Sequence, residues 1–165
     1  MAAPRANPGG FRAFLAANEV GKNDAQTGFN IDMGRDATAQ FDQLNVEGSG
    51  FSGILNLLDR PGSFGTLHVL ELVADPGRRT VRLNLDGRPS GERSLAPAPI
   101  SLDEVTVGAR SASFRGEPLR AFGPLPGDIA EVLIYNRALS ADETKAVRQY
   151  LDRKYAPLRE ALPPR

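Results

Sequence analysis

The stretch GDIAEVLIYNRALSADE, residues 127–143, decides the fold that this chain is expected to adopt. Its apolar part, residues 129–135, predicts the last strand of a sheet. Ser140 has the side chain of a helix N-cap, and Glu143 follows it at the spacing of a capping box. The stretch therefore predicts a strand, a short loop and a helix, in that order.

Apolar residues recur on one side of the predicted helix. Val147 and Leu151 are four residues apart and share one helical face, which is expected to anchor the helix to the rest of the molecule. Pro157 is expected to end the helix, because proline lacks the backbone N–H that a helix interior needs.

The composition excludes several classes of site. The formal net charge is zero, with arginines scattered among acids, so nothing directs this surface to nucleic acid or to an anionic membrane. The chain has no cysteine, which removes disulfides, thiolate metal sites and cysteine nucleophiles. No apolar run approaches the ~18 residues of a membrane span. A chain of 165 residues fits one domain with a substantial core.

Short strands separated by turns are predicted along most of the chain. Residues 80–85 alternate, so Val81, Leu83 and Leu85 are expected on one face. Residues 66–74 are apolar on both faces, which indicates a central strand. Residues 11–17 are expected to form a first strand, and a helix is the alternative, because alanines favour a helix. Turns are expected at 75–78 and 86–87 and a loop at 111–127. The other expected strands are residues 28–33, 39–46 and 104–108.

The strand-to-helix motif over 129–155 resembles the closing signature of a known family, the laminin G-like or concanavalin A-like lectin-glucanase jelly-roll domains. The hairpin that ends in Leu-Asp-Gly-Arg at 85–88 resembles the same family. The resemblance is strongest over residues 66–155. Members usually begin with an apolar strand that carries an aromatic residue, often Trp; this chain has no Trp, and Phe11 or Phe14 stands in its place.

The resemblance implies an all-β fold: an antiparallel two-sheet jelly-roll sandwich with one short C-terminal α-helix. The sandwich domain is expected over residues 11–156. Residues 1–10 are expected to form an irregular N-terminal arm, and residues 157–165 a Pro-rich C-terminal tail. The family resemblance also suggests an extracytoplasmic location, although the chain opens with no apolar signal-peptide region.

A non-catalytic binding module is the function that we expect, with a carbohydrate or protein ligand. The alternative is a structural accessory subunit or domain packed into a larger assembly. Ordered Pro-rich ends would favour this alternative, since free arms of that kind are usually disordered. A glycoside hydrolase comes third, because the paired carboxylates Glu-x-Asp-x-x-Glu of such enzymes in this fold are absent. No enzyme activity is therefore expected.

The long loop before the last strand supplies the candidate contact surface. Arginine and aromatic side chains are favoured at protein interfaces, and ordinary loop packing is the alternative. The candidate contact residues are Arg110, Phe114, Arg115, Arg120 and Phe122.

Calcium is a possible cofactor, because related domains often bind it through loop oxygens. Asp32, Asp36 and Asp42 are hard oxygen donors in or beside loops, as are Asn23 and Asp24. None of their spacings matches a dedicated calcium loop, so solvated turn carboxylates are the competing interpretation.

Two further features predict structure more than chemistry. The glycines of GSGFSG, residues 48–53, have dinucleotide-motif spacing, but Pro61 follows too soon for the helix that such a motif needs. His68 is the single histidine and is expected within a strand, so a metal site or a Ser-His-Asp relay would depend on it alone.

Overall fold

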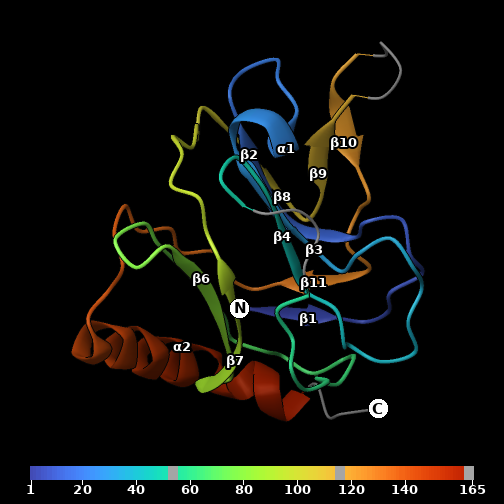
Figure 1. Cartoon of the computed structure of the whole chain (residues 1–165). Helices are drawn as coiled ribbons and strands as arrows, with labels where there is room; N and C mark the ends of the chain where they lie inside the picture. Colours follow the sequence, from blue (N-terminus) through green and yellow to red (C-terminus); the bar gives the residue numbers. More distant parts are fainter. Residues whose placement is uncertain (52–55, 114–117, 162–165) are drawn as a thin grey trace.

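The computed structural model describes residues 1–51, 56–113 and 118–161. It consists mostly of β-strands in several antiparallel sheets, followed by a C-terminal helix (Figure 1). The predicted all-β class with a C-terminal helix is confirmed.

The largest sheet has four strands in the order β4-β3-β2-β8. Its strands are β2 (Ala13–Asn18), β3 (Phe29–Asp32), β4 (Asn45–Gly48) and β8 (Glu104–Val107). The strand predicted for residues 11–17 is therefore present as β2, and the alternative helix is not formed there. The prediction for 39–46 is right only at its end, because the preceding residues make isolated bridges and loops.

The second sheet has the order β5-β6-β7, built from β5 (Leu70–Asp75), β6 (Thr80–Leu85) and β7 (Arg88–Ser94). The strand prediction for 80–85 is confirmed. Asp86 and Gly87 both have positive φ, 51° and 79°, as the two-residue turn between twisted strands requires. The strand predicted at 66–74 is present from Leu70 as β5, but its predicted central position is wrong, because β5 lies at the edge of this sheet.

The N-terminus is part of the fold. β1 (Ala2–Pro4) is buried and pairs with β11 (Gly127–Ile129). Two backbone hydrogen bonds, of 3.0 and 2.8 Å, join Ala2 to His68 just before β5. The prediction of an irregular arm is therefore wrong for Ala2–Pro4, since their backbone groups find partners distant in the sequence.

The last third of the chain departs most from expectation. The strand predicted at 129–135 ends at Ile129, and residues 130–140 connect β11 to the helix without regular structure. The expected loop at 111–127 instead contributes to β9 (Arg110–Ala112) and β10 (Arg120–Phe122), which pair as a two-stranded sheet.

The C-terminal helix α2 (Ala141–Ala161) begins as predicted. The Ser140 N–H donates to Glu143 Oε2 at 2.9 Å, and the Glu143 N–H donates to Ser140 Oγ at 3.3 Å, which forms the capping box. Leu151 is buried and Val147 is half-buried on the anchoring face. The prediction that Pro157 ends the helix is wrong: one helical hydrogen bond is lost there, yet the final turn follows.

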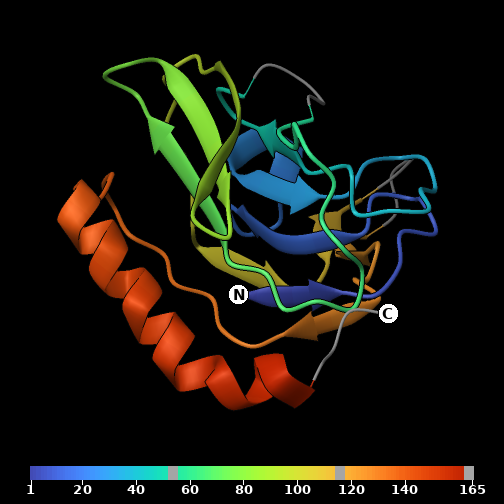
Figure 2. The same cartoon turned by 90° about the horizontal axis from the view of Figure 1, so that it is seen from below.

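A shorter helix, α1 (Asp24–Thr27), precedes β3. No helix in the described part of the chain is long and apolar enough to cross a membrane. Figure 2 shows α2 on the outside of the molecule, running beside the segment that leads to it from β11.

The hydrophobic core draws residues from both larger sheets. Phe41 lies at its centre, with ring centroids 5.9 Å from Phe14, 6.2 Å from Phe64 and 5.7 Å from His68. The buried core cluster comprises Ala2, Phe14, Met33, Phe41, Leu44, Val46, Phe51, Leu57, Leu58, Val81, Leu83 and Leu95.

Truncation of a core side chain tests this arrangement. Leu83 is 1% exposed, so we expect Leu83→Ala to lower the free energy of unfolding by about 2–5 kcal/mol through lost burial and a residual cavity. Val107→Ala, at a position 54% exposed, should cost under about 1 kcal/mol. Urea unfolding measures both variants, and equal losses would contradict the assignment of the core.

Candidate functional site

One face of the four-stranded sheet is polar. Asn30 and Asp32 alternate along β3 with apolar residues that face the core. In the register of β3 with β4, Asn30 lies opposite Glu47, and Asp32 lies opposite Asn45. Because directly opposite residues share a face, these four side chains project together on the side away from the core.

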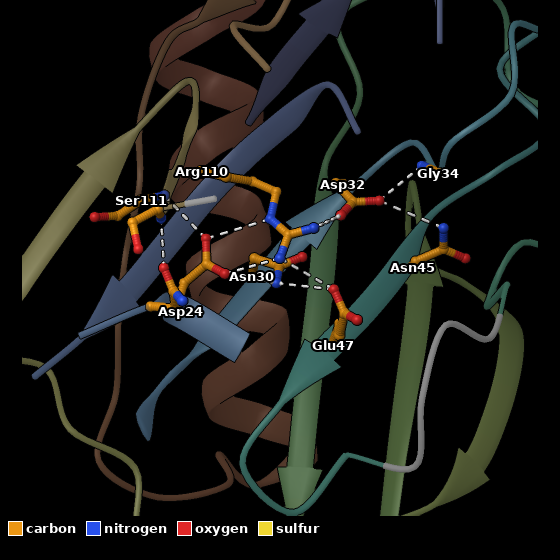
Figure 3. A network of polar contacts seen from close by, with 10 residues as sticks. Asp24, Asn30, Asp32, Gly34, Asn45, Glu47, Arg110 and Ser111 are labelled. Carbon is orange, nitrogen blue, oxygen red and sulfur yellow. Dashed lines mark hydrogen bonds and ion pairs between the residues drawn. The ribbon is translucent and has the colours of Figure 1, made fainter. Parts of the chain in front are cut away.

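Arg110 of β9 lies over this polar face, and three carboxylates surround it (Figure 3). Its Nη2 is 2.8 Å from Asp24 Oδ1 and 3.1 Å from Glu47 Oε2, and its Nη1 is 3.5 Å from Asp32 Oδ2. Asp24 comes from α1, so one guanidinium joins a helix and two strands to β9. We call Arg110, Asp24, Asp32 and Glu47 the arginine cluster.

Neighbouring groups complete the arginine cluster. The Ser111 N–H donates to Asp24 Oδ2 at 2.9 Å, and Asn30 Nδ2 donates to Asp24 Oδ1 at 3.2 Å. The Gly34 N–H donates to Asp32 Oδ1 at 2.7 Å. The cluster is therefore held by backbone as well as side-chain donors.

Burial governs the electrostatics of the cluster. Asp24 and Asp32 are 0% and 1% exposed. Burial raises the pKa of Asp32, and the hydrogen bond from Gly34 and the charge of Arg110 offset only part of that rise. Burial lowers the pKa of Arg110. The hydrogen bond to Asp24 and the charge of Asp24 raise it by more, so the net shift is upward. The guanidinium therefore stays protonated.

The charged groups of the arginine cluster pair with one another. Three carboxylates face one guanidinium, and Arg110 is 7% exposed. The Asn30 Oδ1 atom is buried with no hydrogen-bond donor in the described part of the chain. The arrangement can hold the hairpin of β9 and β10 on the sheet, and it leaves one acceptor for a small donor.

The predicted contact residues are not gathered on one exposed surface. Arg110 is buried because its charge is paired inside the cluster, which corrects the expectation that it lies on an exposed loop. Arg120 is exposed on β10, and Phe122 is half-buried opposite Arg110. Phe114 and Arg115 lie outside the described residues, as does Gly53 of the glycine motif.

The predicted calcium ligands are likewise not brought together. Asp32 is bound to Arg110, whereas Asp36 is exposed and Asp42 is half-buried. Within residues 1–51, 56–113 and 118–161 no group of three His, Cys, Asp or Glu side chains could hold a metal ion. Asp24, named with Asn23 as an alternative donor, serves Arg110 instead.

His68 is buried and forms a second charge pair with Asp86, whose side chain is 41% exposed, and the sequence did not identify this partner. Its Nδ1 is 2.7 Å from Asp86 Oδ2, and its Nε2 is 2.9 Å from the Ser63 carbonyl oxygen. A carboxylate and a carbonyl can only accept hydrogen bonds, so both ring nitrogens donate and the imidazole is positively charged. The pair joins the segment before β5 to the turn between β6 and β7.

The pKa values of the pair support this assignment. Burial lowers the pKa of His68, but the hydrogen bonds to Asp86 and Ser63 outweigh it, and the net shift is upward. Burial raises the pKa of Asp86, but the hydrogen bonds from His68 and from the Val69 N–H outweigh it, and the net shift is downward.

A scan against protein-family models, a search of curated proteins and a search of solved structures each found no match. The laminin G-like resemblance therefore stays a prediction. Inference about function depends on the geometry of this chain.

Loss of the guanidinium should destabilise the fold. We expect Arg110→Met to lower the free energy of unfolding at pH 7 by about 3–5 kcal/mol, because buried carboxylates lose their counter-charge. Arg78→Met, which breaks an exposed pair with Asp75, should cost under about 1 kcal/mol. Chemical denaturation at pH 7 and pH 4 checks this, and the Arg110→Met loss should shrink as Asp32, whose pKa is raised by burial, takes up a proton. An equal loss at both pH values would contradict the cluster.

The His68 pair predicts a pH-dependent stability. Since the folded-state pKa of His68 exceeds its ordinary value of ~6.5, its contribution is complete below that pH. It is lost as pH rises through the folded-state pKa. His68→Gln should therefore lose less stability than the unmodified chain between pH 6 and 9, as measured by urea unfolding. The Met1 amine, whose pKa burial lowers, titrates in both chains, so their difference isolates His68. Identical pH profiles would contradict the charged pair.

Proposed function

We propose that this chain is a non-catalytic binding module whose ligand is a protein. The supporting observation is an exposed apolar edge. β8 is the end strand of the four-stranded sheet, and its Val105 and Val107 are 45% and 54% exposed. Ile100 and Leu102, which lead into this strand, are also exposed. We call these four residues the β8 edge.

Aliphatic surface on an edge strand suits a protein ligand. Contiguous exposed apolar residues mark interaction sites, and an edge strand offers backbone groups for pairing with another chain. A glycan site would need polar groups beside a stacking aromatic ring. On the polar face of this sheet, the carboxylates of Asp24, Asp32 and Glu47 are instead engaged by Arg110.

The jelly-roll sandwich remains our proposal for the finer architecture. It is supported by two antiparallel sheets that share one core, and by the capping box at Ser140. The Asp86–Gly87 turn supports it too. We also propose an extracytoplasmic location, which only the family resemblance supports.

The accessory-subunit alternative has less support than the sequence suggested. It depended on Pro-rich ends being ordered by an outside partner. The N-terminal residues are ordered by pairing of β1 with β11 and by the bonds from Ala2 to His68 within the chain. Order at this end therefore needs no larger assembly.

Photo-cross-linking tests the proposed function. A benzophenone side chain at position 107 in native cells should yield one discrete protein adduct, whereas the same group at exposed position 88 on β7 should yield none. Val105→Asp should abolish the adduct, because a charge on the β8 edge opposes apolar burial. On a glycan array the chain should bind nothing.

Two results would contradict the proposal. One is an adduct that forms equally at positions 88 and 107. The other is saturable glycan binding that free sugar competes away and that Val105→Asp leaves unchanged. The latter would identify the ligand as a carbohydrate.

A further inference from the structure

The His68 imidazole lies between two acceptors that belong to separate segments. Its Nδ1 faces the Asp86 carboxylate in the turn between β6 and β7, and its Nε2 faces the Ser63 carbonyl oxygen. A protonated ring donates to both acceptors, but a neutral ring carries only one N–H. Loss of one proton therefore removes one of these two hydrogen bonds, whichever ring nitrogen keeps its hydrogen.

The bond to Ser63 is the one that a neutral ring gives up. The bond to Asp86 is the shorter, at 2.7 Å against 2.9 Å, and bonds to a charged acceptor are stronger than neutral ones. The Asp86 carboxylate is also fixed from its other side, because the Val69 N–H donates to Oδ1 at 2.8 Å. The remaining hydrogen therefore stays on Nδ1, and Nε2 and the Ser63 carbonyl become two acceptors that face each other without a donor.

Ser63 can move more readily than the histidine. Two backbone hydrogen bonds with Ala2 fix His68, and the Phe41 ring lies against the imidazole. Ser63 is exposed and lies outside regular structure, so water can replace the ring as the donor to its carbonyl. Rotation of this peptide carries the next residue, Phe64, whose ring centroid is 6.2 Å from that of Phe41.

Hydrogen bonds on both sides confine this movement to two residues. The Gly62 N–H donates to the Phe41 carbonyl at 2.7 Å, and the Gly65 N–H donates to the Pro4 carbonyl at 2.7 Å. The peptide that joins residues 63 and 64 can therefore rotate while the chain before and after it stays attached. We call residues 63–64 the cover segment, because Phe64 packs against the buried Phe41.

The charges around the imidazole set the pH at which it loses its proton. Burial lowers the pKa of His68, and so does the charge of Arg159 from α2. The hydrogen bonds to Asp86 and Ser63 and the charge of Asp86 outweigh both effects, so the net shift is upward. The ring therefore keeps its proton in the folded chain at pH ~6.5, where a free histidine is half-protonated, and loses it at a higher pH.

We propose that His68 is a pH-sensitive latch on the cover segment: the protonated ring holds the segment against Phe41, and loss of one proton releases it. Phe41 is 1% exposed while the latch is closed, so release of Phe64 uncovers apolar surface that the closed form buries. The change is local, because the flanking bonds of Gly62 and Gly65 do not involve the imidazole. The inference does not rest on the proposed protein-binding function, since it does not involve the β8 edge.

A single tryptophan reports the position of the cover segment, since the chain has none of its own. In Phe64→Trp, acrylamide quenching should rise at least about twofold in one step between pH 6 and 9. Adding His68→Gln should abolish the step, because an amide does not titrate. Adding Asp86→Asn, which keeps an acceptor but removes the charge, should move the midpoint down by at least about half a pH unit. Asp75→Asn, at the opposite end of β6, should leave the midpoint in place.

Nuclear magnetic resonance of the unmodified chain guards against an effect of the reporter itself. The Ser63 carbonyl carbon should shift with the same midpoint as the His68 ring nitrogens, because one proton controls both. The N–H signals of Val81 and Leu83 in β6 should keep their positions, which shows that the sheet stays folded. A Ser63 signal that does not follow His68 would overturn the proposal. So would a quenching step that persists in His68→Gln, or a step that coincides with loss of the β6 signals.

Discussion

The burial of one guanidinium constrains much of this structure. Arg110 needs counter-charge because a buried unpaired cation is very costly, and it obtains that charge from Asp24, Asp32 and Glu47. These residues lie on α1, β3 and β4, so their common partner fixes all three elements against β9. The ring of Phe11, 5.4 Å from the guanidinium carbon, adds a cation–π contact.

A second charge pair joins two other segments of the chain. His68 and Asp86 bring together the segment before β5 and the turn after β6, while backbone bonds attach Ala2 to His68. The core around Phe41 lies against the same histidine ring. Electrostatic pairing and apolar packing therefore fix the N-terminal strand together, although residues 1–10 as a whole are rich in Pro and Gly.

The arginine cluster places charged side chains inside the molecule, whereas several apolar side chains remain on its surface. Two of the carboxylates that the sequence offered as metal ligands, Asp24 and Asp32, are buried against Arg110 instead. Apolar side chains remain outside along β8 and at 132–135. The exposed apolar residues of β8 support our proposal that the ligand is a protein.

The sequence by itself determined the all-β class, the alternating strand β6 with its Asp86–Gly87 turn, and the capping box that starts α2. Each depends on residues a few positions apart, whose preferences act locally. Only the tertiary structure decided that Arg110 is buried, that Ala2–Pro4 forms a strand, and that the strand predicted at 129–135 ends at Ile129. The physical reason is that counter-charges and ladder partners come from segments far along the chain: Arg110 meets Asp24 at a separation of 86 residues. An apolar run shows that a strand can form, but its pairing depends on which edge lies beside it.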